Sequence, residues 1–429
     1  MIQRPTLILA LLTLLNFVNY LDRFLVSAVA PKIQESLGIN DAQIGWITSA
    51  FMFGYFLTSP AFGWLGDRHK RKGLIAAGVA VWSLATVASG LATTFESMFA
   101  ARVLVGIGEA SYASLSPTII DDIAPPKRKN AYLAIFYLAT PVGSALGFVL
   151  GGFLQHRYGW RNAFFVAGGP GVLLALVTLL IAEPARKTAE EGEGATSEGG
   201  ATDGANGGAK KHEAAAKPAS PYLVLARERL YVLAVAGYVA QTFALGGFTA
   251  WAPQYLKRKL GMELHEADFW FGAVTVATGF AGTGLGGWWA DRMKGDRVIA
   301  CLKICAISSA LATPFAAACL FMPTPALFFA AMALCELALF LSVSPTNAAI
   351  MLSVPVMVRA NAMAVSIFAI HLLGDLVSPP LIGTISDRRG AGASGLQLGM
   401  YLLPAALAIS AIVWARGARA KAPASPAAA

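Results

Sequence analysis

The stretch GWLGDR at residues 63–68 recurs along the chain and decides how its helices are organised. GWWADR at 287–292 and GTISDR at 383–388 share its G-x-x-x-D-R pattern. GFLQHR at 152–157 keeps the glycine and the arginine but has histidine in place of aspartate. A pattern that returns at intervals along a chain indicates repeated structural units. Four copies therefore predict four related units.

The residues around these copies have the composition of an integral membrane protein. Of the 429 residues, 56% are hydrophobic and 13% are charged, whereas a soluble globular chain has about 25% charged residues. Apolar runs of about 20 residues are long enough to cross a bilayer as helices. They predict twelve spans, at 6–30, 42–65, 73–92, 97–120, 130–154, 162–182, 230–255, 268–290, 298–321, 325–352, 360–385 and 396–415.

The four copies of the pattern fall at the ends of the second, fifth, eighth and eleventh spans. A signature on every third helix indicates three-helix units, arranged as inverted pairs within two six-helix halves. This all-α architecture resembles that of the major facilitator transporters. The expected domains are an N-terminal bundle at 1–182, a flexible linker at 183–221 that is polar and rich in glycine, and a C-terminal bundle with a short tail at 222–429.

The formal charge of +9 fits a membrane topology better than nucleic-acid binding. Lysine and arginine gather in alternate loops, for example at 68–72 and 127–129, and cytoplasmic loops carry this excess. We therefore expect both termini and the linker in the cytoplasm, a location in the cell membrane (the inner membrane in a bacterium), a monomer, and no nucleic-acid partner. The four cysteines lie in apolar spans, where we expect no disulfide.

The recurring pattern is a candidate gate. Gly63 and Asp67 are four residues apart, so they share one helix face. The glycine allows a neighbouring helix to approach, and the carboxylate can meet the positive N-terminal end of that helix. A simpler alternative is that these charges only fix the topology. The candidate gate residues are Gly63, Asp67, Arg68, Asp291, Arg292, Asp387 and Arg388.

Charged residues also lie inside the first and fourth spans, where an ionised side chain is costly unless it is paired or hydrated. In the first span Arg23 shares a face with Asn16 and Tyr20, and Asp22 lies on its flank. Neighbours in sequence do not face each other on a helix, so Asp22 and Arg23 should have different partners. In the fourth span Arg102 and Glu109 are about 10 Å apart along the axis, too far for a direct pair.

The tenth and eleventh spans repeat this design with Glu336, His371 and Asp375. We expect the four polar spans to face one central cavity, with arginines that suit phosphate, sulfate or carboxylate. A carboxylate in a partly dehydrated cavity can exchange protons near neutral pH, so Glu109, Asp22, Glu336 and Asp375 are candidates for proton coupling. The alternative is a static ion-pair network that holds the helices together.

Four stretches resemble a narrower group, the Spinster family of proton-linked lysolipid and sphingolipid transporters. They are LNFVNYLDRF at 15–24, RVLVGIGEASYASLSPTIIDD at 102–122, AIFYLATPVGSALGF at 134–148 and HLLGDLVSPPLIGTISDR at 371–388. The resemblance implies that Arg23 and Arg102 engage an anionic head group and that Asp22 and Glu109 take part in proton coupling. It also implies that Asn16, Tyr20, Glu336 and His371 line the cavity.

The function expected from these features is secondary active transport of an anionic amphiphile by alternating access, driven by a proton gradient without a cofactor or metal. The chain lacks the G-x-x-x-x-G-K-[ST] phosphate loop of ATP-driven pumps. A small organic anion, such as a sugar acid or a phosphate ester, is the rival substrate. A lipid-modifying enzyme would need a nucleophile motif or metal ligands, and neither is found in the sequence. A receptor would have no need of the three-helix repeats, and a channel would conduct without saturable, proton-dependent exchange.

Overall fold

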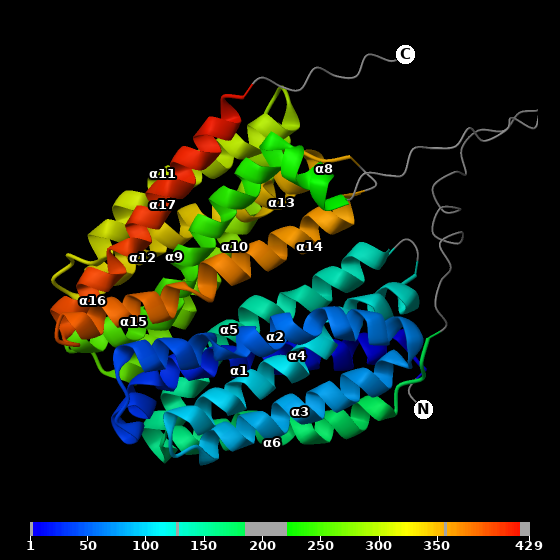
Figure 1. The fold of residues 1–429 in the computed structure, drawn as a ribbon, viewed down its shortest axis with the longest axis horizontal. Helices are drawn as coiled ribbons and strands as arrows, with labels where there is room; N and C mark the ends of the chain where they lie inside the picture. Colours follow the sequence, from blue (N-terminus) through cyan, green and yellow to red (C-terminus); the bar gives the residue numbers. More distant parts are fainter. Residues whose placement is uncertain (1–2, 126–127, 185–220, 356–357, 421–429) are drawn as a thin grey trace, which may run out of the picture.

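The computed structural model describes residues 3–125, 128–184, 221–355 and 358–420, and Figure 1 shows their fold. These residues form a bundle of helices, as the apolar periodicity predicts. The first half contains α1 (Pro5–Leu37), α2 (Asp41–Arg68), α3 (Arg71–Leu91), α4 (Phe95–Ile123), α5 (Lys129–Tyr158) and α6 (Trp160–Leu179). Most of the expected linker, 185–220, lies outside the described residues.

The second half begins with a short helix, α8 (Pro221–Arg227), followed by α9 (Arg229–Leu260), α10 (Leu264–Arg292) and α11 (Arg297–Cys319). Each of the last three spans is divided. They comprise α12 (Pro325–Leu341) with α13 (Val343–Leu352), α14 (Arg359–Ile370) with the π-helical turn η3 (His371–Asp375) and α15 (Ser378–Arg388), and α16 (Ala393–Met400) with α17 (Leu402–Ala418).

Side-chain caps fix where several helices start. The side chain of Asn40 accepts a hydrogen bond from the backbone amide of Gln43, and the backbone amide of Asn40 donates one to the Gln43 side chain, which forms a capping box at the start of α2. Thr94 and Ser97 form the same arrangement at the start of α4. These caps satisfy amides that a helix leaves unpaired at its N-terminus.

Ten helical stretches among the described residues are long and apolar enough to cross a membrane. The other two expected spans correspond to α2 and α10, which have 28 and 29 residues and are not among those ten. Both helices pack across the boundary between the halves, α2 against α15 and α10 against α5.

The two halves meet at one end of the bundle and diverge toward the end that holds α8 and the N-terminus (Figure 1). We call the first the sealed end, where α1 and α3 finish and α2, α4 and α10 begin, and the other the separated end. The main contacts between the halves join α5 to α10 and α2 to α15. The sealed end therefore holds the halves together.

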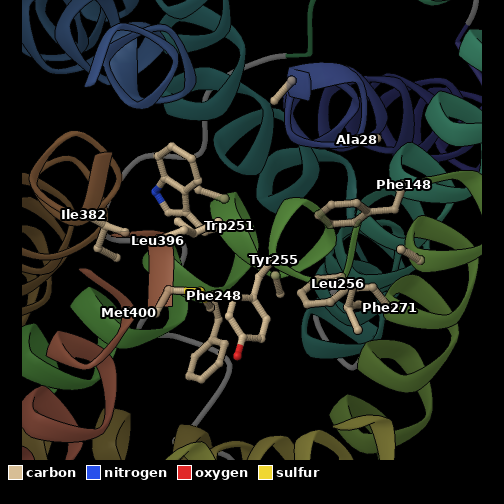
Figure 2. Close-up of a cluster of buried hydrophobic side chains, with 14 of the residues drawn as sticks. Ala28, Phe148, Phe248, Trp251, Tyr255, Leu256, Phe271, Ile382, Leu396 and Met400 are labelled. Atoms are coloured by element: carbon tan, nitrogen blue, oxygen red, sulfur yellow. The ribbon is translucent and has the colours of Figure 1, made fainter. Parts of the chain in front are cut away.

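A shared hydrophobic cluster lies between the halves. Figure 2 shows Ala28, Phe148 and Trp251 among its side chains, which come from α1, α5 and α9. The rings of Phe148 and Phe271 are 4.9 Å apart, and the Trp251 indole donates to the carbonyl oxygen of Pro379. Trp251 and Phe271 are almost fully buried, so they fill this core and do not line an open groove.

Candidate functional site

The intramembrane charges of α1 and α4 form two crossed ion pairs. Arg23 donates from Nη2 to Oε2 of Glu109 at 2.6 Å. Arg102 Nη1 lies 3.6 Å from Oδ1 of Asp22, whose other oxygen accepts a hydrogen bond from Thr86 of α3. Asp22 and Arg23 thus have different partners. Neither charge of α4 pairs with the other, because each reaches across to α1.

These four side chains are buried but not fully satisfied. Arg23 is 16% exposed, whereas Asp22, Arg102 and Glu109 are at most 1% exposed. Buried atoms without a hydrogen-bond partner are Asp22 Oδ1, Arg23 Nε, Arg102 Nε and Nη1, and Glu109 Oε1. An unsatisfied buried polar group costs about 1–3 kcal/mol. The cluster therefore has spare donors with which to bind an anion.

Aromatic rings surround the guanidinium of Arg23. Its Cζ lies 4.6 Å from the ring centre of Phe51, 5.0 Å from that of Tyr20 and 5.9 Å from that of Tyr55. Rings at this distance attract a cation by about 0.5–2 kcal/mol. Arg23 can thus stay in place when its carboxylate partner changes.

Asn16 connects α1 to α5. Its amide nitrogen donates to the carbonyl oxygen of Phe136 at 3.0 Å and to the hydroxyl of Thr140 at 3.4 Å. The side chain is buried, and its nitrogen is occupied by these contacts. In this conformation Asn16 therefore positions α1 and α5, one turn before Tyr20.

The expected polar groups of the second half lie apart from this cluster. Nδ1 of His371 is 2.9 Å from Oδ2 of Asp375, within the π-helical turn η3. Such turns are frequent at functional sites, and no pattern in the sequence predicted this one. The ring of Phe56 lies 6.2 Å from that of His371 and 5.9 Å from that of Tyr55. Aromatic contacts thus lead from Arg23 toward His371.

Glu336 is held inside the second half. The hydroxyls of Thr275 and Thr278 donate to its two oxygens at 3.0 and 2.9 Å. The cavity beside Glu336 has a volume of about 20 Å³, which is enough for roughly one water molecule. The structure does not bring Glu336 into contact with the arginines of the first half.

The last copy of the recurring pattern joins the halves at the sealed end. Asp387 accepts hydrogen bonds from the backbone amides of Asp41 at 2.9 Å and Ala42 at 2.8 Å. A Cβ on Gly383 would lie 2.2 Å from the carbonyl oxygen of Asp41. Glycine is required for this close approach, and the carboxylate caps the N-terminus of α2.

Asp41 is a member of this contact that sequence reasoning missed. It accepts hydrogen bonds from both terminal nitrogens of Arg258 at 2.7 Å, and from Gln34 and Ser386. Arg258 lies in the last turn of α9, far from Asp41 in the sequence. The capping residue Asn40 marks the helix start, but no pattern in the sequence links Asp41 with position 258.

At the separated end, the glycines of the two copies do not approach another helix as closely as Gly383 does. Nothing lies within 4 Å of a Cβ placed on Gly63, and Gly287 has only Ser344 nearby. Arg68 and Arg292 each lie over a tryptophan of their own helix. Asp291 is exposed and 3.9 Å from Arg297, while Arg388 is exposed at the sealed end. The side chain of Asp67 lies outside the described residues.

A second buried network joins α3, α4 and the end of the first half. Arg71, which counted in the sequence only as a topology signal, is 2.6 Å from Asp122 and 3.3 Å from Glu183. Glu183 also accepts from the backbone amides of Arg71 and Lys72. Residue 183, expected as the start of the linker, thus packs against the first half.

Within the part of the chain that the structure describes, no group of three or more histidine, cysteine or acidic side chains could hold a metal ion. The four cysteines are free and buried.

Comparison with known proteins identifies the relatives of this chain. A family model for the Major Facilitator Superfamily matches residues 12–379. Protein spinster homolog 1 of Homo sapiens is 33% identical over 416 residues, which are 90% of this chain and 74% of that protein. A protein of Arabidopsis thaliana named as a probable sphingolipid transporter, spinster homolog 1, is 28% identical over 446 residues, which are 96% of this chain and 88% of that protein.

Solved structures share the fold. A bacterial homologue of the human lysosomal transporter Spinster, in an inward-facing and unoccupied conformation, aligns with a TM-score of 0.81 and 22% identity over 97% of both chains. A D-xylose–proton symporter aligns with a TM-score of 0.75 and 14% identity over 95% of this chain and 96% of that one. With the family match and the curated relatives, the helices and intramembrane charges place this chain in the Spinster family of membrane transporters, within the major facilitator superfamily.

Proposed function

We propose that this protein is a proton-coupled secondary active transporter of anionic amphiphiles, such as lysophospholipids or sphingosine-phosphate-like lipids. The observation that carries the proposal is the pair of crossed contacts between α1 and α4. Arg23 is the most accessible of the four charges, and it is paired with a fully buried carboxylate, Glu109. An anionic head group can take the place of that carboxylate on Arg23.

This exchange would couple substrate to protons. Once the head group claims Arg23, Glu109 remains buried without a cation, and a buried unpaired charge is strongly unfavourable. Proton uptake by Glu109 removes that charge. Asp22, paired with Arg102 and bonded to Thr86, is the second proton-coupling candidate. The spare donors of Arg102 add a further contact for the anion.

An apolar groove beside the cluster supports an amphiphile rather than a small anion. It measures about 610 Å³ and is lined almost entirely by apolar side chains of α1 and α5, including Leu9, Phe17 and Leu138. Its lining residue Phe17 lies about one turn before Tyr20 on α1. An acyl chain in this groove would leave its head group near Arg23.

We further propose alternating access with both termini in the cytoplasm, because lysine and arginine gather in the loops of the separated end. On this proposal the structure corresponds to an inward-facing state, in which the contact of Asp387 with α2 closes the sealed end. Gly63, Asp67, Arg68, Asp291 and Arg292 would form the opposite contact when the separated end closes. His371 and Asp375 would enter the site in that closure.

Uptake of labelled lysophospholipid and sphingosine phosphate into proteoliposomes, with and without a pH gradient, tests the proposal. Arg23→Ala is combined with Glu109→Gln, so that no buried charge is left unpaired, and this double variant should lose uptake. Glu109→Gln alone should still bind lipid but lose the response to the gradient. Glu96→Gln, an exposed acid on the same helix, is the matched control.

Gradient-driven uptake that persists in Glu109→Gln would refute the coupling role of Glu109. Protein that is folded, fails to move either lipid, and takes up an organic anion would refute the lipid substrate and favour the rival. To test the groove, Ala10→Trp should slow lipid uptake, while Ala310→Trp, at an exposed position on α11, should not. Equal rates for these two variants would exclude the groove as the acyl-chain site.

A further inference from the structure

Asp268, on the second turn of α10, is a buried acid that the proposed site does not use. Its side chain is fully buried, and neither carboxylate oxygen has a hydrogen-bond partner. It lies at the boundary between the halves: a Cβ on Gly152 of α5 would be 2.8 Å from its Oδ2. That glycine begins GFLQHR, the copy of the recurring pattern in which His156 replaces the aspartate.

The surroundings of Asp268 form successive layers between α5 and α10. On one side, the rings of Phe148 and Phe271 pack 4.9 Å apart, and both are shown in Figure 2. On the other side, one turn toward the helix start, the imidazoles of His156 and His265 stack at 4.3 Å. Asp268 is thus enclosed between an aromatic layer and a histidine pair, and each layer joins the two halves.

The other contact at the sealed end is built differently. There Asp387 and Asp41 each accept several hydrogen bonds, and Asp41 also has a cation, Arg258. Those carboxylates are surrounded by hydrogen-bond donors. Asp268 has no such support, and an isolated buried carboxylate is far more costly than its neutral acid.

The charged and titratable groups of the neighbouring helices do not change this conclusion. Among the described residues, none has an ion pair or hydrogen bond with Asp268. At this end they are His156 and Arg157 of α5, His265 and Glu266 of α10, Lys257, Arg258 and Lys259 of α9, and Lys32 and Glu35 of α1. Arg258 is bound to Asp41, Lys32 to Glu35, and Glu336 of α12 to two threonines of α10. The charges of α11, Arg297 and Lys303, lie near its start at the separated end, and α13 has none.

We infer that Asp268 carries a proton while the sealed end is closed and releases it when α5 and α10 separate and water reaches the carboxylate. Opening of this end is thereby linked to the loss of one proton. The inference rests on the alternating-access part of the proposed function and adds a proton-linked residue outside the substrate site. Because opening releases a proton, higher pH should favour the open state and lower pH the sealed one.

A conformational measurement without lipid tests this inference. Spin labels at Thr93→Cys and Pro323→Cys, exposed positions of the two halves at the sealed end, report its opening as a distance distribution. Because the four native cysteines are buried, the label reacts with the two introduced cysteines. In the otherwise native protein, the ratio of open to sealed molecules should rise about tenfold per pH unit in the linked window. Asp268→Asn and Asp268→Ala should remove this slope.

Glu266→Gln is the matched control, since this exposed acid lies two residues away, and it should keep the native slope. A native distribution that does not change with pH would overturn the inference. So would a slope that survives in Asp268→Asn, or one that disappears only in the double variant His156→Gln/His265→Gln. Because this measurement uses no lipid, its outcome does not depend on whether the protein transports lipid.

Discussion

Asp387→Asn should weaken the sealed end, and the structure gives the size of the effect. Asp387 accepts two backbone hydrogen bonds from the start of α2, at 2.9 and 2.8 Å. A hydrogen bond to a charged group contributes about 1.5–3 kcal/mol, and a negative charge at a helix N-terminus about 0.3–1 kcal/mol. Asparagine keeps one acceptor oxygen but loses the charge. The expected loss is therefore about 2–4 kcal/mol.

Since about 1.4 kcal/mol corresponds to a tenfold change, the ratio of open to sealed molecules should rise by roughly 30-fold to 700-fold. The assay is the distance distribution between spin labels at Thr93→Cys and Pro323→Cys. Arg389→Gln is the control, because that side chain is exposed and close in sequence but takes no part in the contact. A distribution in Asp387→Asn that matches the native one would refute the reasoning.

Three further predictions use the same halves and contacts. Gly383→Ala should open the sealed end, because its Cβ would meet the Asp41 carbonyl oxygen at 2.2 Å. Gly63→Ala should leave the spin-label distance distribution unchanged, since nothing lies within 4 Å of a Cβ at that position. Equal behaviour of the two variants would contradict the assignment of the ends. Thr278→Val should lower the melting temperature, because it leaves one oxygen of Glu336 unsatisfied at a cost of about 1–3 kcal/mol. The double variant Thr278→Val/Glu336→Leu should recover part of this loss. No recovery would show that the cost comes from packing alone. Arg102→Met with Asp22→Asn should fold but reduce lipid affinity measured by equilibrium binding, and unchanged affinity would remove Arg102 from the substrate site.

The charged cluster shows where sequence reasoning stops. The helical faces of α1 and α4 place Arg23, Asp22, Arg102 and Glu109 inside the membrane and exclude a direct pair between the two charges of α4. The choice of partners depends on how α1 and α4 pack, which a single helix does not determine. Glu336 shows the same limit, since its threonine partners on α10 keep it away from the arginines.

The sequence alone determined the helical class, the membrane-spanning character and the recurring motif, because apolar length, charge placement and repetition are properties of the chain itself. The tertiary structure decided which copies of the motif are engaged, through Asp387 and Gly383 at one end and not through Gly63 or Gly287 at the other. It also revealed Asp41 and Asp268, whose roles arise from groups of the opposite half. A transporter that works by alternating access closes at either end in turn, so a pattern encoded equally at both ends does not specify which end is closed.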